Sequence, residues 1–80
     1  MSSKNILVLD LRREAESCGG VVAAILTYLR KLRSGDEMKI IADESQVKEL
    51  EEALDLFVRH GVIRIISKNS PTEYIIARGK

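Results

Sequence analysis

The stretch MKIIADESQV, residues 38–47, joins a strand signal directly to a helix signal. Met38–Ala42 is a short apolar run and predicts a strand. Asp43 follows as a candidate N-cap, and Gln46 stands three places further on, which together form a plausible capping box. We therefore predict a strand over Met38–Ala42 and a helix that begins immediately after it.

This helix carries one apolar stripe on an otherwise charged surface. Gly61 is predicted to end it. The stripe recurs at three- and four-residue steps and consists of Val47, Leu50, Leu54, Phe57 and Val58.

Upstream of this stretch the chain predicts another strand, a loop and another helix. Asn5–Asp10 is a nearly continuous apolar run, as in a strand that is at least partly covered on both faces. Leu11–Glu16 is charged without an apolar period, and with the segment 17–20 it is predicted to be a loop. A helix of about 14 residues should begin at Val21 and end at Ser34-Gly35-Asp36. Its predicted buried stripe is Val22, Ile25, Leu26, Leu29 and Leu32.

The last part of the chain predicts a hairpin. Val62–Ser67 and Tyr74–Arg78 are β-rich runs, joined by the polar segment Lys68–Glu73, which contains the only proline. The element order is β-α-β-α-β-β. Two helices with one apolar stripe each are both buried most simply on one face of a four-stranded sheet. The fold class is therefore an α/β (α+β) two-layer sandwich with a mixed sheet, because right-handed crossovers make β-α-β strands parallel and the hairpin is antiparallel.

Composition limits both the fold and the function. Eighty residues, 45% of them hydrophobic and 31% charged, make one soluble domain over 1–80 with no room for a deep pocket. We find no apolar run long enough for a membrane span and no targeting segment, and a formal charge of +1 lacks the field of non-specific nucleic-acid binders. The single cysteine, with one histidine, is too few for a structural zinc site, and we expect no cofactor and a reducing, cytoplasmic location.

Cys18 is the candidate nucleophile. It precedes Gly19, Gly20 and Val21 at the predicted start of the first helix, where unpaired amides and the positive end of the helix dipole favour a thiolate. The glycines have no side chains to keep these three amides from an anionic sulfur or a second sulfur attached to it. The alternative interpretation is that Cys18 is a small apolar side chain that fills space beneath the loop.

Basic residues suggest a second kind of site. Arg30, Lys31 and Arg33 crowd the end of the first helix, where they complement the dipole or receive an acidic partner surface. Arg12 and Arg13, in the predicted loop, would add to the positive charge. His60 and Asp43 are interpreted as helix caps rather than as catalytic groups.

The chain as a whole resembles the TusA (SirA-like) sulfur-carrier family of small β-α-β-α-β-β proteins. The resemblance rests on Leu9-Asp10 at the end of a strand, the cysteine before a helix, LRKLRSGDE at residues 29–37, IIAD at 40–43, and YIIARGK from Tyr74. The family signature C-P-x-P is altered to Cys18-Gly19-Gly20-Val21, and the loop before the cysteine is longer, charged and free of glycine.

The resemblance implies a function for Cys18. In the family, the cysteine accepts sulfane sulfur as a persulfide and passes it to a partner protein. The implied partners are a sulfur donor, such as a cysteine desulfurase or a rhodanese, and a sulfur-acceptor protein, for example in tRNA thiolation. Two alternatives stay open: a non-catalytic nucleic-acid- or protein-binding module whose face contains Arg12, Arg13, Arg30, Lys31 and Arg33, and a subunit that has lost the transfer step.

Overall fold

A computed structural model describes residues 6–79 and contains one four-stranded sheet. Its strands are β1 (Leu7–Asp10), β2 (Glu37–Ile41), β3 (Ile63–Ser70) and β4 (Glu73–Arg78). The strand order is β1-β2-β4-β3, with β1 parallel to β2 and β4 antiparallel to both of its neighbours. The predicted mixed sheet is confirmed. Asn5, at the start of the first predicted strand, lies outside the described residues.

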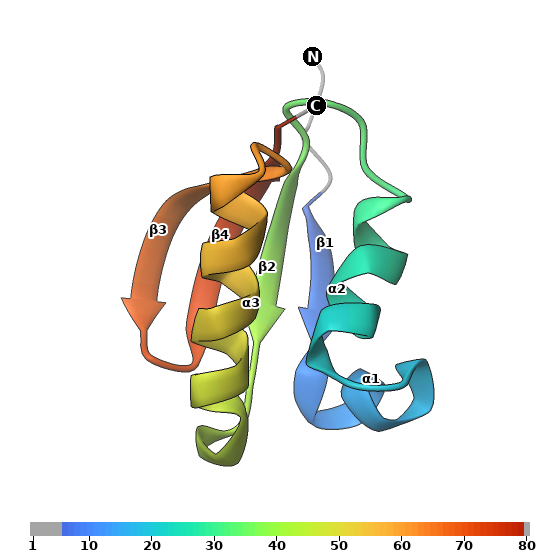
Figure 1. The fold of residues 1–80 in the computed structure, drawn as a ribbon, viewed down its shortest axis with the longest axis vertical. Helices are drawn as coiled ribbons and strands as arrows, with labels where there is room; N and C mark the ends of the chain where they lie inside the picture. Colours follow the sequence, from blue (N-terminus) through green and yellow to red (C-terminus); the bar gives the residue numbers. More distant parts are fainter. Residues whose placement is uncertain (1–5, 80) are drawn as a thin grey trace.

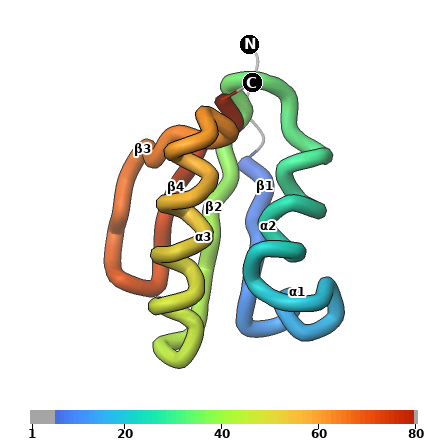
Figure 2. The backbone as a smooth tube through the Cα atoms, viewed as in Figure 1, coloured from blue at the N-terminus to red at the C-terminus, as the bar shows by residue number. Residues whose placement is uncertain are grey.

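The helices form the second layer and cover one face of the sheet (Figure 1). The backbone trace in Figure 2 shows the same two layers. The helical segments are α1 (Leu11–Cys18), α2 (Val21–Leu29), the 3-10 turn η1 (Glu44–Gln46) and α3 (Val47–Arg59). The two-layer sandwich is therefore confirmed, with α1 as an unpredicted addition. None of the helices in residues 6–79 is both long and apolar enough to cross a membrane.

The core lies between the sheet and the helices. Leu9 of β1, Met38 and Ile40 of β2, and Ile76 of β4 are fully buried on the covered face. Burying a side chain of this size stabilises a fold by roughly 1.5–3 kcal/mol. The helices contribute fully buried or nearly buried side chains to the same core: Leu11, Ala15, Val21, Ala24, Ile25, Leu29, Leu50, Ala53, Leu54 and Phe57.

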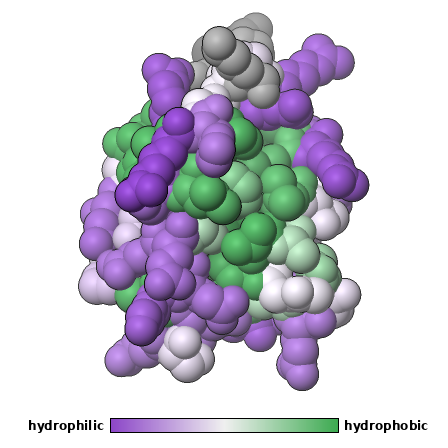
Figure 3. Space-filling model, viewed as in Figure 1, coloured by the Kyte–Doolittle hydropathy of each residue, from purple (hydrophilic) through white to green (hydrophobic). Residues whose placement is uncertain are grey.

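The stripe predicted for α2 is only partly correct. Ile25, Leu29 and Leu32 are buried, whereas Val22 is 39% exposed and Leu26 is 40% exposed. Val21 and Ala24 complete the buried face of α2 instead, and the helix ends at Leu29, so it is shorter than predicted. Figure 3 shows the resulting apolar surface on the helix layer, bordered by hydrophilic side chains.

Helix α3 follows its prediction more closely. Asp43 caps η1 through a capping box: the backbone N–H of Asp43 donates to Gln46 Oε1 at 2.9 Å, and Asp43 Oδ2 accepts from the Ser45 N–H at 3.2 Å. Of the predicted stripe, three members are buried, Val47 is half-buried and Val58 is exposed. Val58 instead lines an open groove together with Ile63 and Ile65 of β3.

The hairpin is antiparallel, as predicted, but its strands are longer. β3 continues to Ser70, so the turn is Pro71-Thr72 rather than a six-residue connection. The register of β3 against β4 shifts between Ile65 and Ser67 and again between Lys68 and Ser70. The end of β3 is polar because an edge strand is exposed to solvent and accommodates polar side chains. In the sequence this segment therefore resembles a loop.

Candidate functional site

Residues 11–18, predicted to be a loop, form the helix α1. Asp10 is its N-cap: Oδ1 accepts from the Arg12 backbone N–H at 3.1 Å, and the carboxylate also accepts from the Arg12 guanidinium at 2.9 Å. Leu11 and Ala15, one turn apart, are buried against the core. With Cys18 they form an i, i+4, i+7 series, which is the sequence signal that could have predicted this helix.

Cys18 is therefore the last residue of a helix rather than a residue before one. Gly19 follows as the C-cap, with φ 92°, in the left-handed region that glycine adopts readily. The C-terminal end of a helix carries the negative end of the dipole. The position of Cys18 does not supply the positive helix end that the sequence interpretation placed at the sulfur.

The glycine pair closes α1. The Gly19 N–H donates to Glu16 O at 3.3 Å, and the Gly20 N–H donates to Ala15 O at 2.6 Å. These two bonds are the pattern of a Schellman motif, which satisfies carbonyls at the end of a helix. The amides of Gly19 and Gly20, which were expected to face a persulfide, therefore already donate to carbonyls of α1.

Val21 is in a different position because it begins α2. The first bond of α2 is from the Ala24 N–H to Gly20 O at 3.0 Å, and Gly20 as N-cap provides no side-chain bond. The first-turn amides of a helix have no partner within the helix itself. Of the amides of Gly19, Gly20 and Val21, only that of Val21 does not donate to a carbonyl of α1.

The pocket that the glycine pair lines does not include Cys18. It has a volume of about 410 Å³, and its other lining residues come from α1, the start of α2, Gln46 and Glu49. Cys18 instead is half-buried and packs against the core together with Tyr28. This environment agrees in part with the alternative interpretation, in which Cys18 fills space.

The neighbours of Cys18 come from both helices. Burial raises the pKa of Tyr28, and so do the charge of Glu14, a hydrogen bond from the Tyr28 hydroxyl to that carboxylate and, as a smaller effect, the nearby Cys18. Lys31 places its ammonium group 4.6 Å from the centre of the Tyr28 ring. Glu14, Tyr28 and Cys18 therefore lie close together where α1 packs on α2. The sequence interpretation missed Glu14 and Tyr28 because their contact depends on α1 being a helix.

The predicted basic residues are not brought together. Arg12 and Arg13 lie in the first turn of α1, and Arg12 is held by Asp10. The remaining three are at the far end of α2, where Arg30 is the C-cap. The structure thus contains no single basic face made of all five residues, which removes one support for the nucleic-acid alternative.

The end of α2 is held by a cation that the sequence analysis did not consider. Nη1 of Arg78, from β4, donates to Leu29 O at 3.1 Å and to Leu32 O. A cation beside the last carbonyls of a helix satisfies them and complements the dipole. The sequence predicts only a strand at Arg78, because α2 is more than 40 residues away along the chain.

Comparison with known proteins adds no relative: no family model matches the chain, and neither does any curated protein or solved structure.

Proposed function

We propose that the protein is a small sulfur carrier in which Cys18 accepts sulfane sulfur as a persulfide and passes it to a partner protein in a sulfur-trafficking or thiolation pathway. The observation that carries this proposal is the position of the only thiol, half-exposed at the turn between the first two helices. The two-layer fold with its four-stranded mixed sheet and the sequence resemblance support it.

The transfer step is a simple exchange. The Cys18 thiolate attacks the terminal sulfur of a donor persulfide, a new S–S bond forms at Cys18, and the donor S–S bond breaks. The donor cysteine leaves as a thiolate, and any proton on the terminal sulfur moves with it, so no external oxidant is needed. The acceptor thiolate then attacks the outer sulfur of the Cys18 persulfide, and Cys18 leaves as a thiolate. This chemistry needs an accessible sulfur and a docked partner rather than a deep pocket.

The surroundings of Cys18 suggest how a persulfide would be accommodated. Gly19, next to Cys18, has no side chain, and even a Cβ at this position would meet only Ala23 Cβ, at 3.9 Å. Tyr28 lies near Cys18 with its hydroxyl bound to Glu14, and the Lys31 ammonium lies 4.6 Å from the centre of the Tyr28 ring. In this proposal Lys31 supplies positive charge near the site, because the amides of Gly19 and Gly20 are occupied by α1.

Intact-mass measurement tests the proposal. The protein is incubated with a cysteine desulfurase and L-cysteine, or with a small-molecule persulfide donor, and should gain sulfur that dithiothreitol removes. Because the chain has one cysteine, Cys18→Ser should gain none. A folded wild-type protein that gains no sulfur from any of these donors would refute the proposal.

A further inference from the structure

The strand β3 forms one edge of the sheet. Among residues 6–79 it pairs with β4 alone. Alternate residues of this eight-residue strand therefore direct their backbone N–H and C=O groups away from the sheet. Figure 1 shows β3 at the left edge of the sheet, to the side of α3, where the helix layer does not cover it. A long, uncovered edge strand is a template for pairing with another extended chain.

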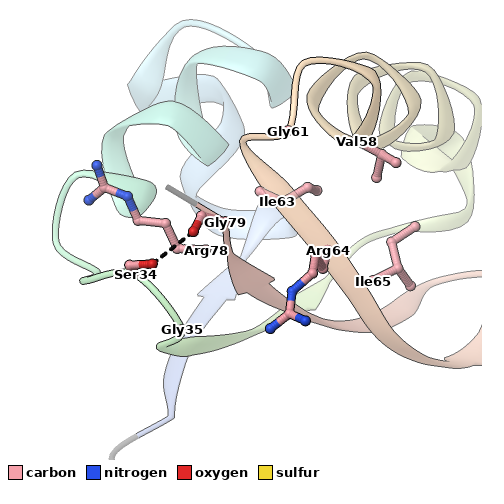
Figure 4. A pocket seen from close by; sticks show the side chains of 9 residues that line it. All are labelled: Ser34, Gly35, Val58, Gly61, Ile63, Arg64, Ile65, Arg78 and Gly79. Carbon is pink, nitrogen blue, oxygen red and sulfur yellow. Dashed lines mark hydrogen bonds between the residues drawn. The ribbon is translucent and has the colours of Figure 1, made fainter.

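The side chains of β3 add an apolar surface to this edge. Ile65 is 46% exposed and Ile66 is 48% exposed. An open groove of about 650 Å³ lies alongside, and Val58 of α3 lines it together with Ile63 and Ile65 of β3 (Figure 4). Side chains of an added strand that point toward the helix layer would therefore meet apolar atoms in this groove.

The charge of the edge is positive. β3 contains Arg64 and Lys68 and no acidic residue. Lys68 lies 4.0 Å from Glu51, whereas the Arg64 guanidinium has no ion-pair partner among residues 6–79. Figure 4 shows the Arg64 side chain directed away from Val58. Arg64 lies between Ile63 and Ile65 in β3, and neighbouring residues of a strand point to opposite faces. Arg64 also lines the groove, so this edge presents apolar side chains together with a cation that has no ion-pair partner among residues 6–79.

A second copy of the chain fits this edge poorly. Two β3 edges pairing with each other would place basic strand beside basic strand, and like charges across a strand pair are destabilising. The register shifts after Ile65 and after Lys68 also interrupt a long regular ladder. An acidic partner strand avoids the repulsion between like charges, and a short one needs no long regular ladder.

We propose that the β3 edge and the groove beside it bind an extended segment of a partner protein by strand addition. The segment alternates apolar residues, which enter the groove beside Val58, with acidic residues, which face Arg64. Main-chain hydrogen bonds to β3 supply affinity, and the alternation supplies selectivity. The proposal does not depend on the chemistry of Cys18.

The test uses a short blocked peptide of alternating valine and glutamate and a counterpart with lysine in place of glutamate. Titrated into the ¹⁵N-labelled protein, the glutamate peptide should shift amide resonances along β3 and slow their hydrogen exchange. Arg64→Glu should weaken binding roughly tenfold. Ile65→Thr, which keeps a β-branched side chain but shortens its apolar part, should weaken binding several-fold.

The control is Lys48→Glu, the same type of charge reversal at an exposed position of α3. It should bind the glutamate peptide as the wild type does. The proposal is overturned if the glutamate peptide does not bind, if the lysine peptide binds equally well, if the shifts lie outside β3, or if Lys48→Glu loses as much affinity as Arg64→Glu. Concentration-dependent dimerisation through β3, seen by sedimentation, would assign the edge to a second copy and also overturn it.

Discussion

Asp10 and Asp43 occupy equivalent positions in the two halves of the helix layer. Each stands at the end of a strand and caps the helical segment that follows. The Asp10 carboxylate accepts from the Arg12 N–H at 3.1 Å, and that of Asp43 accepts from the Ser45 N–H at 3.2 Å. Yet the sequence reveals only the second, because Gln46 completes a capping box and a long apolar stripe follows.

The difference lies in what each cap is followed by. The 13-residue helix α3 has an apolar face that is visible as a period. The eight-residue helix α1 has two buried side chains, Leu11 and Ala15, among charged ones. A helix that short is marginal by itself in water and depends on tertiary packing. Short helices of this kind are recognised from their caps and their few buried contacts rather than from their composition.

Removing the buried leucine from each helix gives the largest expected effect. Leu11 and Leu50 are both fully buried, so Leu11→Ala and Leu50→Ala should each lower the free energy of unfolding by about 2–5 kcal/mol. Urea denaturation followed by circular dichroism measures both values. Val22→Ala, at an exposed position of α2, is the control and should cost much less. A small loss for Leu11→Ala beside a large one for Leu50→Ala would show that residues 11–18 are not docked as a helix.

The glycines that follow α1 and α3 provide the next comparison. Gly20 has φ 119° and ψ 175°, a conformation that is essentially restricted to glycine, so Gly20→Ala should cost about 1–3 kcal/mol. Gly61, after α3, has φ 71° and lies in the left-handed region that asparagine tolerates. Gly61→Asn should therefore cost less than Gly20→Ala in thermal unfolding. Equal stability of Gly20→Ala and the wild type would contradict the closed turn between α1 and α2.

Much of the fold follows from local patterns in the sequence. The four strands, the hairpin and the cap at Asp43 are each marked by residues within a few positions of one another. The ends of the elements are less well marked, because polar residues in β3 tolerate an edge position. The exposure of Val22 and Leu26 could not be predicted, because it depends on how α2 is rotated against the sheet.

The candidate site was predicted less completely than the fold. The sequence identifies Cys18 as the only thiol, but its surroundings depend on α1. Once residues 11–18 are helical, the amides of Gly19 and Gly20 are bound and Tyr28 becomes a neighbour. The partners of the sulfur are therefore set by contacts between elements, for which the local sequence gives no signal.

Gln46 connects the two caps, and its substitution should have a smaller effect. Its Nε2 donates to Leu11 O at 2.9 Å, while its Oε1 accepts from Asp43 N. Gln46→Glu keeps the acceptor and loses the donor, which should cost about 0.5–1.5 kcal/mol in urea denaturation. Gln46→Met removes both groups at similar length and should cost more. If neither variant differs from the wild type, the start of α1 and the capping box of η1 are energetically independent.

The smallest expected effect is the pH dependence of the caps, because both carboxylates are near solvent. A hydrogen bond from the Arg12 side chain lowers the pKa of Asp10 from its ordinary value of 3.8, and one from the Ser45 side chain lowers the pKa of Asp43. A lowered folded-state pKa means that the folded protein binds fewer protons than the unfolded chain. The stabilisation is therefore complete above the unfolded pKa and is lost as pH falls through the lower folded value.

Thermal unfolding between roughly pH 5 and pH 2 measures this loss. Asp10→Asn and Asp43→Asn should each be less stable than the wild type at the upper end of the range and should each show a shallower fall in Tm toward the lower end. The guanidinium of Arg12 binds both oxygens of Asp10, whereas Asp43 is held by neutral donors. Asp10→Asn should therefore flatten the profile more, and salt should reduce that difference. Parallel profiles for Asp10→Asn and the wild type would mean that Asp10 does not cap α1 in solution.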